Sequence, residues 1–212
     1  MHLNPPRLEC LEPRRLLDGE FATLGPTGTL TVAGSPGDDH YVVSGVNPGA
    51  NELIQVERNG ETLQFPQRDV GRIVFEGGEG NDYFEIRPDT NSVRTTLRGG
   101  AGNDTLIGGQ YFDLIYGGVG ADLLKGGNQR DTIFGDGGKD RIFGNGFNDD
   151  LRGGAGDDKI NGGPGDDRIN GGRGNDTLSS AGGADTVFGG ADNDTGLDLA
   201  LISTVDGIEN LI

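Results

Sequence analysis

The nine residues from 99 to 107 read Gly-Gly-Ala-Gly-Asn-Asp-Thr-Leu-Ile, and this pattern repeats without a break up to residue 197. Eleven copies follow one another, and each has aspartate at its sixth position. The eighth position is leucine, isoleucine or valine in every copy but the last, which has Gly196 there. Glycine opens every copy except the one that begins at Ser180. A fixed short period of this kind predicts a solenoid, in which each repeat stacks on its neighbours.

The glycine-rich first six positions of each copy favour a tight turn, because glycine accepts the positive φ angles that other residues resist. The last three positions are too few for a helical turn and predict a short strand, in which only the eighth side chain faces inward. Two copies then make one coil, with a turn at each end and two short strands facing each other across a thin core. The sequence therefore predicts an all-β protein, a parallel β-solenoid.

Stacking of such coils lines up the aspartates in two columns, one on each edge of the solenoid. The first column contains Asp104, Asp122, Asp140, Asp158, Asp176 and Asp194, and the second contains Asp113, Asp131, Asp149, Asp167 and Asp185. Carboxylates stacked at the strand spacing of about 4.8 Å repel each other unless a cation lies between them. Calcium accepts six to eight oxygen ligands in flexible geometry, whereas magnesium demands a strict octahedron, so calcium is the predicted ion.

The repeat resembles the RTX, or haemolysin-type, calcium-binding nonapeptide over residues 99–197. The resemblance implies a right-handed parallel β-roll that holds calcium between successive turns on each edge. It also implies that all eleven aspartates of the two columns are calcium ligands. If every adjacent pair on both edges bound an ion, the chain would hold five and four ions, nine in all.

The two columns differ at the fourth position of the repeat. Glycine occupies it in five successive copies of the first column, whereas the second column has Tyr111, Gln129 and Phe147 before glycine returns at Gly165. A bulky residue is costly where a turn requires positive φ. We therefore predict strong sites between neighbouring aspartates from Asp104 to Asp176, and weak or empty sites at Asp113/Asp131 and Asp131/Asp149.

Calcium is also predicted to control folding. Burial of one aliphatic side chain contributes roughly 1.5–3 kcal/mol, whereas ordering nine residues costs about 1–2 kcal/mol each. One buried side chain per nonapeptide is therefore a thin core. The hypothesis is that the repeat region is largely disordered without calcium and folds when calcium binds.

Residues 1–19 differ in character from the repeats, with three prolines and no apolar run of signal-peptide length. The segment Leu11–Leu17 resembles LEPRxLLS, a short N-terminal motif of exported proteins of some environmental bacteria, although Asp18 replaces its serine. Two interpretations remain open, a flexible tail and a sorting segment. No stretch anywhere in the sequence has the length and apolarity of a transmembrane segment.

Residues 20–98 indicate strands without a clean period, and we expect them to continue the solenoid with wider coils. The predicted strands are Thr29–Ala33, His40–Ser44, Leu53–Glu57, Thr62–Phe65, Arg72–Phe75 and Tyr83–Ile86. Asn59-Gly60 predicts a hairpin between two of them. The segment from Gly77 to Phe84 is close to the repeat, so Asp82 is a further candidate calcium ligand, although Asp104 follows it by more than one regular coil.

Residues 198–212 form the most apolar stretch of the chain. The last coil of a solenoid exposes its core unless something covers it, so a C-terminal cap is predicted. The alternative, implied by the RTX resemblance, is an uncleaved secretion signal, and the two roles are compatible.

The composition limits the functional classes. A formal net charge of −17 argues against nucleic acid as a partner. The sequence has no nucleophile elbow, zinc-protease motif or phosphate-binding loop, so no enzymatic activity is predicted. The first hypothesis is a secreted or surface-exposed calcium-binding scaffold. The alternatives are a module that binds extracellular polysaccharide or a cell surface, with Tyr111, Phe112, Tyr116 and Phe147 as a contact patch, and a non-catalytic accessory domain of an exported enzyme.

Overall fold

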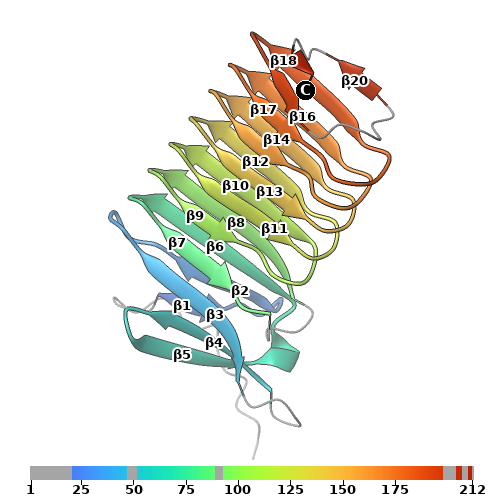
Figure 1. Cartoon of the computed structure of the whole chain (residues 1–212). Coiled ribbons are helices and arrows are strands. Elements are labelled where there is room, and N and C mark those ends of the chain that lie inside the picture. Colours follow the sequence, from blue (N-terminus) through green and yellow to red (C-terminus); the bar gives the residue numbers. More distant parts are fainter. Residues whose placement is uncertain (1–20, 47–51, 89–92, 198–203, 207–209, 212) are drawn as a thin grey trace, which may run out of the picture.

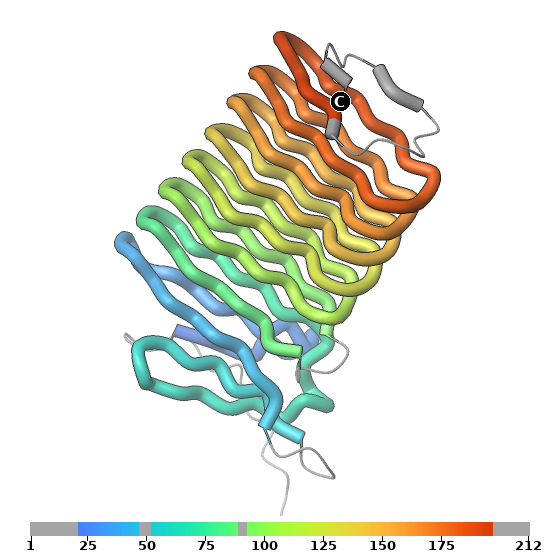
Figure 2. Tube along the Cα trace, viewed as in Figure 1, coloured from blue at the N-terminus to red at the C-terminus, as the bar shows by residue number. Residues whose placement is uncertain are grey.

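The chain folds as a stack of similar coils that forms an elongated solenoid (Figures 1 and 2). A computed structural model describes residues 21–46, 52–88, 93–197, 204–206 and 210–211. Two β-sheets face each other along the stack, and from β6 (Arg72–Glu79) onward the strands alternate between them along the chain. The described residues contain no α-helix, only the short 3-10 helix η1 (Gln67–Asp69). The prediction of an all-β parallel solenoid is confirmed.

Sheet A contains β1, β2 and, from β6 onward, every second strand of the solenoid. Its order is β1 (Ala22–Leu24), β2 (Thr29–Ala33), β6 (Arg72–Glu79), β8 (Arg94–Ala101), β10 (Asp113–Val119), β12 (Thr132–Gly137), β14 (Asp150–Ala155), β16 (Arg168–Arg173), β18 (Thr186–Ala191) and β20 (Thr204–Asp206). All neighbours pair in parallel except β1, which runs antiparallel to β2 at the N-terminal end.

Sheet B contains the strands in between, which are shorter in the repeat region. Its order is β21 (Asn210–Leu211), β19 (Thr195–Leu197), β17 (Thr177–Ser179), β15 (Lys159–Asn161), β13 (Arg141–Asn145), β11 (Leu123–Gly127), β9 (Thr105–Ile107), β7 (Tyr83–Ile86), β3 (His40–Val46), β4 (Leu53–Arg58) and β5 (Glu61–Pro66). Only β3, β4 and β5 pair antiparallel. They lie at the N-terminal end of the stack (Figure 1).

The core of the repeat region is two columns of aliphatic side chains from the eighth positions. Leu106 lies in register with Leu124 in sheet B, and Ile115 lies in register with Ile133 in sheet A. The ten aliphatic residues at these positions are between 0 and 2 % exposed. The eighteen-residue period thus places each apolar side chain on its equivalent in the next coil, which is why the sequence repeats.

Three positions of the repeat face inward, not only the eighth. In β10, Asp113, Ile115 and Gly117 are buried, whereas Leu114 and Tyr116 between them are partly exposed. Among the seventh to ninth positions only the eighth faces inward, as predicted. The strands of sheet A are longer than predicted and extend into the glycine-rich segment, so their alternation also buries the sixth and first positions. The aspartates are therefore buried beside the core.

Residues 21–88 continue both sheets with a larger core. All six strands predicted for this part are present, and Asn59 and Gly60, with φ of 51° and 85°, form the predicted hairpin turn between β4 and β5. Phe84 pairs with Leu106, so the additional residues of this longer coil fall between Ile86 and Arg94. Sequence analysis did not predict β1 or β8. Aromatic rings fill the wider coils, as in the stacked pair Phe75–Phe84, whose centroids are 4.5 Å apart.

The two ends of the chain are described only in part. The predicted N-terminal tail or sorting segment, residues 1–19, lies outside the described residues, as do residues 198–203, 207–209 and 212 of the predicted cap. The backbone of β20 pairs with β18, and that of β21 pairs with β19. Within the described part of the chain, no helix is long and apolar enough to cross a membrane.

The packing predicts a strong penalty for a side chain at the fourth position of the first column. A Cβ atom on Gly138, which has φ of 137°, would overlap the carbonyl group of Gly120 in the preceding coil. We expect Gly138→Ala to lower the free energy of unfolding by about 3–5 kcal/mol, because backbone must move to admit the methyl group. Thermal unfolding in excess calcium measures the effect.

Gly146 supplies the matched control for this substitution. A Cβ atom there would meet nothing within 4 Å, so Gly146→Ala should change stability by less than about 1 kcal/mol. Equal melting temperatures for the two variants would show that the coils do not approach each other as closely as described.

Candidate metal centre

The glycine-rich turns bury two columns of aspartates, one on each edge of the solenoid. We call them the Asp104 edge, where the chain passes from sheet A to sheet B, and the Asp113 edge, where it returns. The eleven aspartates of the repeats are between 0 and 4 % exposed. The two predicted columns are therefore present, but their carboxylates lie inside the turns rather than on the surface.

Each column is joined by hydrogen bonds from the backbone. The amide of Asp104 donates to Oδ1 of Asp122 at 2.7 Å, and the amide of Asp122 donates to Oδ1 of Asp140 at 2.9 Å. The same bond recurs on the Asp113 edge, where the amide of Asp131 donates to Oδ1 of Asp149 at 2.8 Å. One oxygen of each such carboxylate is thus bound by the preceding coil, which offsets part of the repulsion within the column.

The second oxygen of most of these carboxylates has no hydrogen-bond donor. Oδ2 is buried and without a hydrogen-bond partner in nine aspartates: Asp82, Asp104, Asp122, Asp131, Asp140, Asp149, Asp158, Asp167 and Asp176. Burial of a charged oxygen without a partner is strongly unfavourable. A repeated defect of this kind, identical in coil after coil, indicates that a cationic group not supplied by the chain completes the turn.

Backbone oxygens lie beside these carboxylate oxygens. Oδ2 of Asp104 packs against the Cα of Gly99, where a Cβ would also lie 2.6 Å from the carbonyl oxygen of Gly117 in the next coil. The turn beginning at Gly135 repeats the arrangement, with Oδ2 of Asp140 and the carbonyl oxygen of Gly153. Glycine opens the repeat because any side chain there would displace these oxygens.

The donor set fits calcium better than a metal that needs nitrogen or sulfur. In the described residues, no three acidic, histidine or cysteine side chains converge at one point, so backbone carbonyls would have to supply most ligands. Hard oxygen donors, one carboxylate and several carbonyls per turn, match the preference of calcium for flexible oxygen coordination. When bound, the ion would supply positive charge to the buried carboxylates.

The two edges differ in the conformation of their turns. On the Asp104 edge, Gly102, Gly120, Gly138, Gly156 and Gly174 have φ between 117° and 140°. On the Asp113 edge, Gln129 and Phe147 have φ of 69° and 72°, in the left-handed region that disfavours such residues, whereas Tyr111 avoids positive φ. The backbone hydrogen bonds between successive turns also differ between the two edges.

On the Asp104 edge, the fourth-position amide of Gly120 donates to the carbonyl of Gly137 in the next coil at 2.8 Å. On the Asp113 edge, the third-position amides of Asn128 and Gly146 donate instead to Gly109 and Gly127 in their preceding coils at 3.2 and 3.3 Å, and the fourth-position bond returns at Gly165, which donates to Gly182 at 2.9 Å. The first edge is thus the more regular, which agrees with the sequence argument, while its calcium occupancy relative to the second stays a prediction.

Both columns end, at their N-terminal side, in a carboxylate that the chain itself satisfies. Asp39 continues the Asp104 edge, because its amide donates to Oδ1 of Asp82 at 2.9 Å, and its own Oδ2 accepts hydrogen bonds from the amide and hydroxyl of Ser35. On the other edge, Asp113 accepts hydrogen bonds from the Thr95 hydroxyl at 2.6 Å and from the Gly109 amide at 2.7 Å. A hydroxyl residue thus terminates each column.

Sequence analysis did not identify these column ends. The segment Gly34–Tyr41 was recognisable as a loose copy of the repeat, with Asp39 at its sixth position. Thr95 lies one coil before Asp113, where an aspartate would continue that column. Nothing in the sequence around Thr95 marks this role. Only the register of β8 on β10 shows it.

Burial raises the pKa of the column aspartates above the usual value near 3.9. Desolvation raises the pKa of Asp122 and Asp158 to about 7, and the neighbouring aspartates add to the effect. Desolvation, together with the charge of Asp113, raises the pKa of Asp131 further, to about 9. Without a cation, these turns therefore favour protonated carboxyl groups.

The residues of the predicted aromatic patch are distributed over the Asp113 edge and the outer face of sheet A. Tyr111 and Phe112 touch edge to face, with ring centroids 5.7 Å apart, beside the turn of the Asp113 edge. Tyr116 lies on the outer face of sheet A and stacks on Phe134 at 5.0 Å. Phe147, 55 % exposed, belongs to a later turn. Sequence analysis did not include Phe134, although it follows Tyr116 by one coil.

The raised pKa values predict that acid stabilises the metal-free fold. A carboxyl group whose pKa is higher in the folded state contributes stability below its unfolded pKa, near 3.9, and this contribution is lost as pH rises through the folded value. In the presence of a chelator, we expect the β-sheet signal in circular dichroism to decrease between about pH 5 and pH 8, across the pKa values near 6 and 7 of Asp113, Asp122 and Asp158. A chelated protein whose β-sheet signal increases over this interval would contradict the prediction.

Comparison with known families identifies the repeat region. Residues 98–195 match the model of the RTX calcium-binding nonapeptide repeat through overlapping segments at 98–133, 116–151, 134–168, 143–178 and 161–195. Comparison with curated proteins gave no match. The resemblance inferred from sequence is confirmed, and this repeat family binds calcium ions. Residues 98–195 therefore match the RTX calcium-binding nonapeptide repeat, and they fold as a β-solenoid.

Proposed function

We propose that this protein is an exported structural module that binds calcium in the turns of its solenoid and folds when it does so. The observation that carries the proposal is the recurrence of a buried Oδ2 without a hydrogen-bond partner in successive turns. We assign as ligands the eleven repeat aspartates named above and Asp82, together with backbone carbonyl oxygens of the same turns. Asp82 joins the set because its Oδ2 is buried like the others and its amide donates to Asp104.

Calcium binding and folding are coupled in this proposal by charge. The net charge of −17 and the buried carboxylates both oppose the folded state without metal. Micromolar or lower calcium inside a cell would leave the repeats unfolded and suited to export, whereas millimolar calcium outside would fold them. A ligand that binds only the folded state stabilises it by mass action. The family occurs in exported proteins, which supports an extracellular location.

In this role the protein is a scaffold without catalytic chemistry of its own. The aspartates of the two columns are buried in the turns, and their regular spacing serves stacking. A role as accessory domain beside an enzyme encoded elsewhere is compatible with this geometry. A second candidate function, attachment to a polysaccharide or cell surface, is favoured by the arginine and aromatic side chains on the outer face of sheet A.

Calcium titration of the full chain, followed by circular dichroism and calorimetry, tests the main proposal. We expect an increase in β-sheet signal with calcium, reversal by a chelator, and several ions bound per chain. Magnesium at the same concentration should have a much smaller effect, because its octahedral geometry fits the turns poorly. An unchanged strand signal in chelator at neutral pH would reject coupled folding.

Adjacent aspartates of one turn provide a matched pair of variants. Asp158 is buried and its Oδ2 has no hydrogen-bond partner, whereas the side chain of the neighbouring Asp157 is 41 % exposed and pairs with Lys139. Asp158→Asn keeps an oxygen for the Asp140 amide but removes the charge, so it should weaken calcium binding by about tenfold or more at the affected sites. Asp157→Asn should leave calcium binding within about twofold. Calorimetry separates the two, and equal losses would contradict the ligand assignment.

The difference between the edges generates a gain-of-function test. Phe147→Gly removes a bulky residue from a left-handed turn position on the Asp113 edge. We expect tighter calcium binding or an additional occupied site, with a melting temperature in calcium that rises by a few degrees. Val119→Gly, at an exposed third position, is the control. A Phe147→Gly variant with unchanged calcium stoichiometry and affinity would show that the two edges bind equally.

A further inference from the structure

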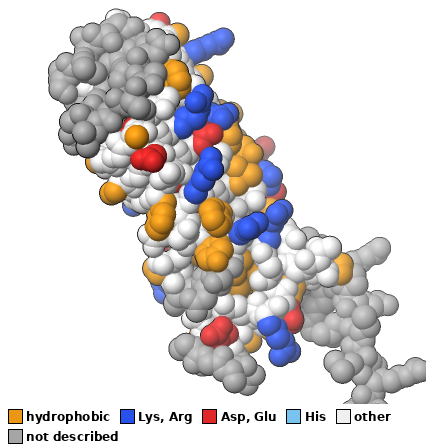
Figure 3. Space-filling view, turned by 90° about the vertical axis from the view of Figure 1, so that its right-hand side faces the viewer, with side chains coloured by type: hydrophobic (Ala, Val, Ile, Leu, Met, Phe, Trp, Pro, Cys, Tyr) orange, Lys and Arg blue, Asp and Glu red, His pale blue; other side chains and the backbone are white. Residues whose placement is uncertain are grey.

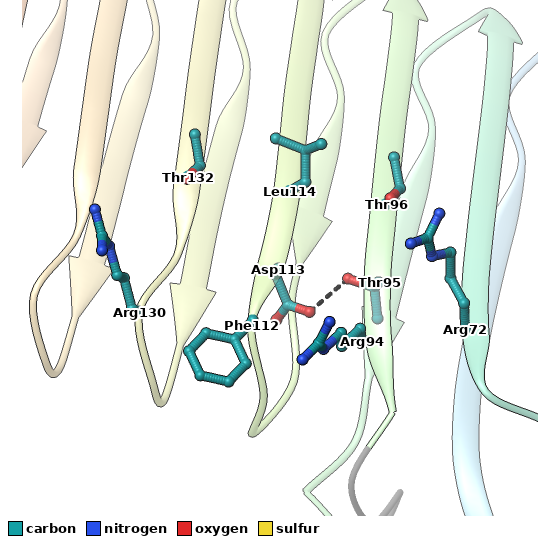
Figure 4. A pocket seen from close by; sticks show the side chains of 9 residues that line it. All are labelled: Arg72, Arg94, Thr95, Thr96, Phe112, Asp113, Leu114, Arg130 and Thr132. Carbon is teal, nitrogen blue, oxygen red and sulfur yellow. Dashed lines mark hydrogen bonds between the residues drawn. The ribbon is translucent and has the colours of Figure 1, made fainter.

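Arginines gather on the outer face of sheet A at the N-terminal end of the repeat region. Arg72 of β6, Arg94 of β8 and Arg130, which precedes β12, line a shallow hollow of about 370 Å³ together with Phe112, Leu114 and Thr132 (Figure 4). In Figure 4 the three arginines and the ring of Phe112 follow one another along the stack. Such a concentration of cations is unusual in a chain of net charge −17.

In the part of the chain that the structure describes, these three arginines form no ion pairs. Among the described residues, ion pairs involve Arg68, Arg98, Lys139 and Arg152, but not Arg72, Arg94 or Arg130. The guanidinium of Arg94 lies 5.6 Å from the centroid of the Phe112 ring, which is 42 % exposed. The Phe112 ring therefore holds the Arg94 guanidinium in place, and the guanidinium remains available to an anion.

The carboxylate nearest to the hollow belongs to the interior. Asp113 lines the hollow but is only 4 % exposed, and its two oxygens accept hydrogen bonds from Thr95 and Gly109 (Figure 4). Both oxygens of Asp113 are thus bound by groups of the chain itself, at the N-terminal end of the column on the Asp113 edge. The arginines on the outer surface are left to interact with groups that come from outside.

The shape of the surface favours a linear ligand. Neighbouring coils are about 4.8 Å apart, so Arg94 and Arg130, two coils apart, are separated by about 10 Å along the stack. A second row runs parallel to these arginines on the same face of sheet A, where Arg98 lies over Tyr116, Tyr116 stacks on Phe134, and Arg152 lies over Phe134. Figure 3 shows Lys and Arg side chains beside hydrophobic ones along the length of one face.

We propose that the arginine and phenylalanine hollow on sheet A binds a linear polysaccharide that bears carboxylate groups. Arginine forks match carboxylates in bidentate geometry, and the flat face of Phe112 suits the apolar face of a sugar ring. The proposal gives the ligand class and the site for the second candidate function above, and it rests on the main one only in that calcium forms the sheet. A sparsely charged polymer fits three arginines, whereas nucleic acid binding needs a longer basic surface to neutralise many phosphates.

Calorimetry with the calcium-loaded full chain and short oligogalacturonates tests this site. We expect saturable binding of the oligouronate and none of its methyl ester, which has the same sugar but no charge. The double variant Arg94→Gln/Arg130→Gln should weaken binding by about tenfold to a hundredfold. Phe112→Ala should weaken it by about tenfold, and circular dichroism should show the same calcium-dependent fold as the parent chain.

Sheet B provides the matched control. Arg141 is exposed there and lies over Phe143 at 5.8 Å, an equivalent pair on the opposite outer face. Arg141→Gln should leave oligouronate binding within about twofold. The proposal is overturned if the parent chain does not bind the oligouronate, if the methyl ester binds equally, if Arg141→Gln weakens binding as much as the double variant, or if a short single-stranded DNA binds the same arginines as tightly. Calcium-dependent folding would persist in each case, so these outcomes leave the main function standing.

Discussion

The burial of a carboxylate oxygen beside backbone oxygens, with no cation from the chain to meet it, is the constraint on which this solenoid depends. Hydrogen bonds from the preceding coil satisfy Oδ1 of each aspartate, as between Asp104 and Asp122. Oδ2 faces the first glycine of its own repeat and a carbonyl oxygen of the next coil. Every coil repeats the same deficit of positive charge, so the stack is stable only if protons or metal ions compensate it.

This deficit gives the protein a physical switch. The apolar core of the repeats is one column of aliphatic side chains per sheet, too thin to hold the coils together against the charge of the aspartates. In the proposed function, a divalent ion bound in a turn would join successive coils and remove the electrostatic penalty at the same time. Protons act on the same groups, as the raised pKa of Asp131 shows, so calcium and acidity compete for the same oxygens.

Only some positions of the repeat are constrained by the fold, so the residues on the outer face can vary. The first, sixth and eighth positions are fixed by packing, turn geometry and the carboxylate columns. The seventh and ninth positions of sheet A face outward and differ from coil to coil, from Tyr116 and Phe134 to Arg152. The proposed arginine and phenylalanine hollow adds the fifth position, which Phe112 and Arg130 occupy, to the seventh-position side chains Leu114 and Thr132.

The sequence by itself determined the solenoid, its eighteen-residue coil, the two aspartate columns and the expected ion, because strict periodicity allows few ways to stack. It also located Asp82 and the Asn59-Gly60 hairpin, since each has a local signature. Only the tertiary structure decided that the aspartates point inward, that Ser35 and Thr95 terminate the columns, and that Arg72, Arg94 and Arg130 share one surface. These features depend on the register of strands that are far apart in the sequence, and no local pattern encodes that register.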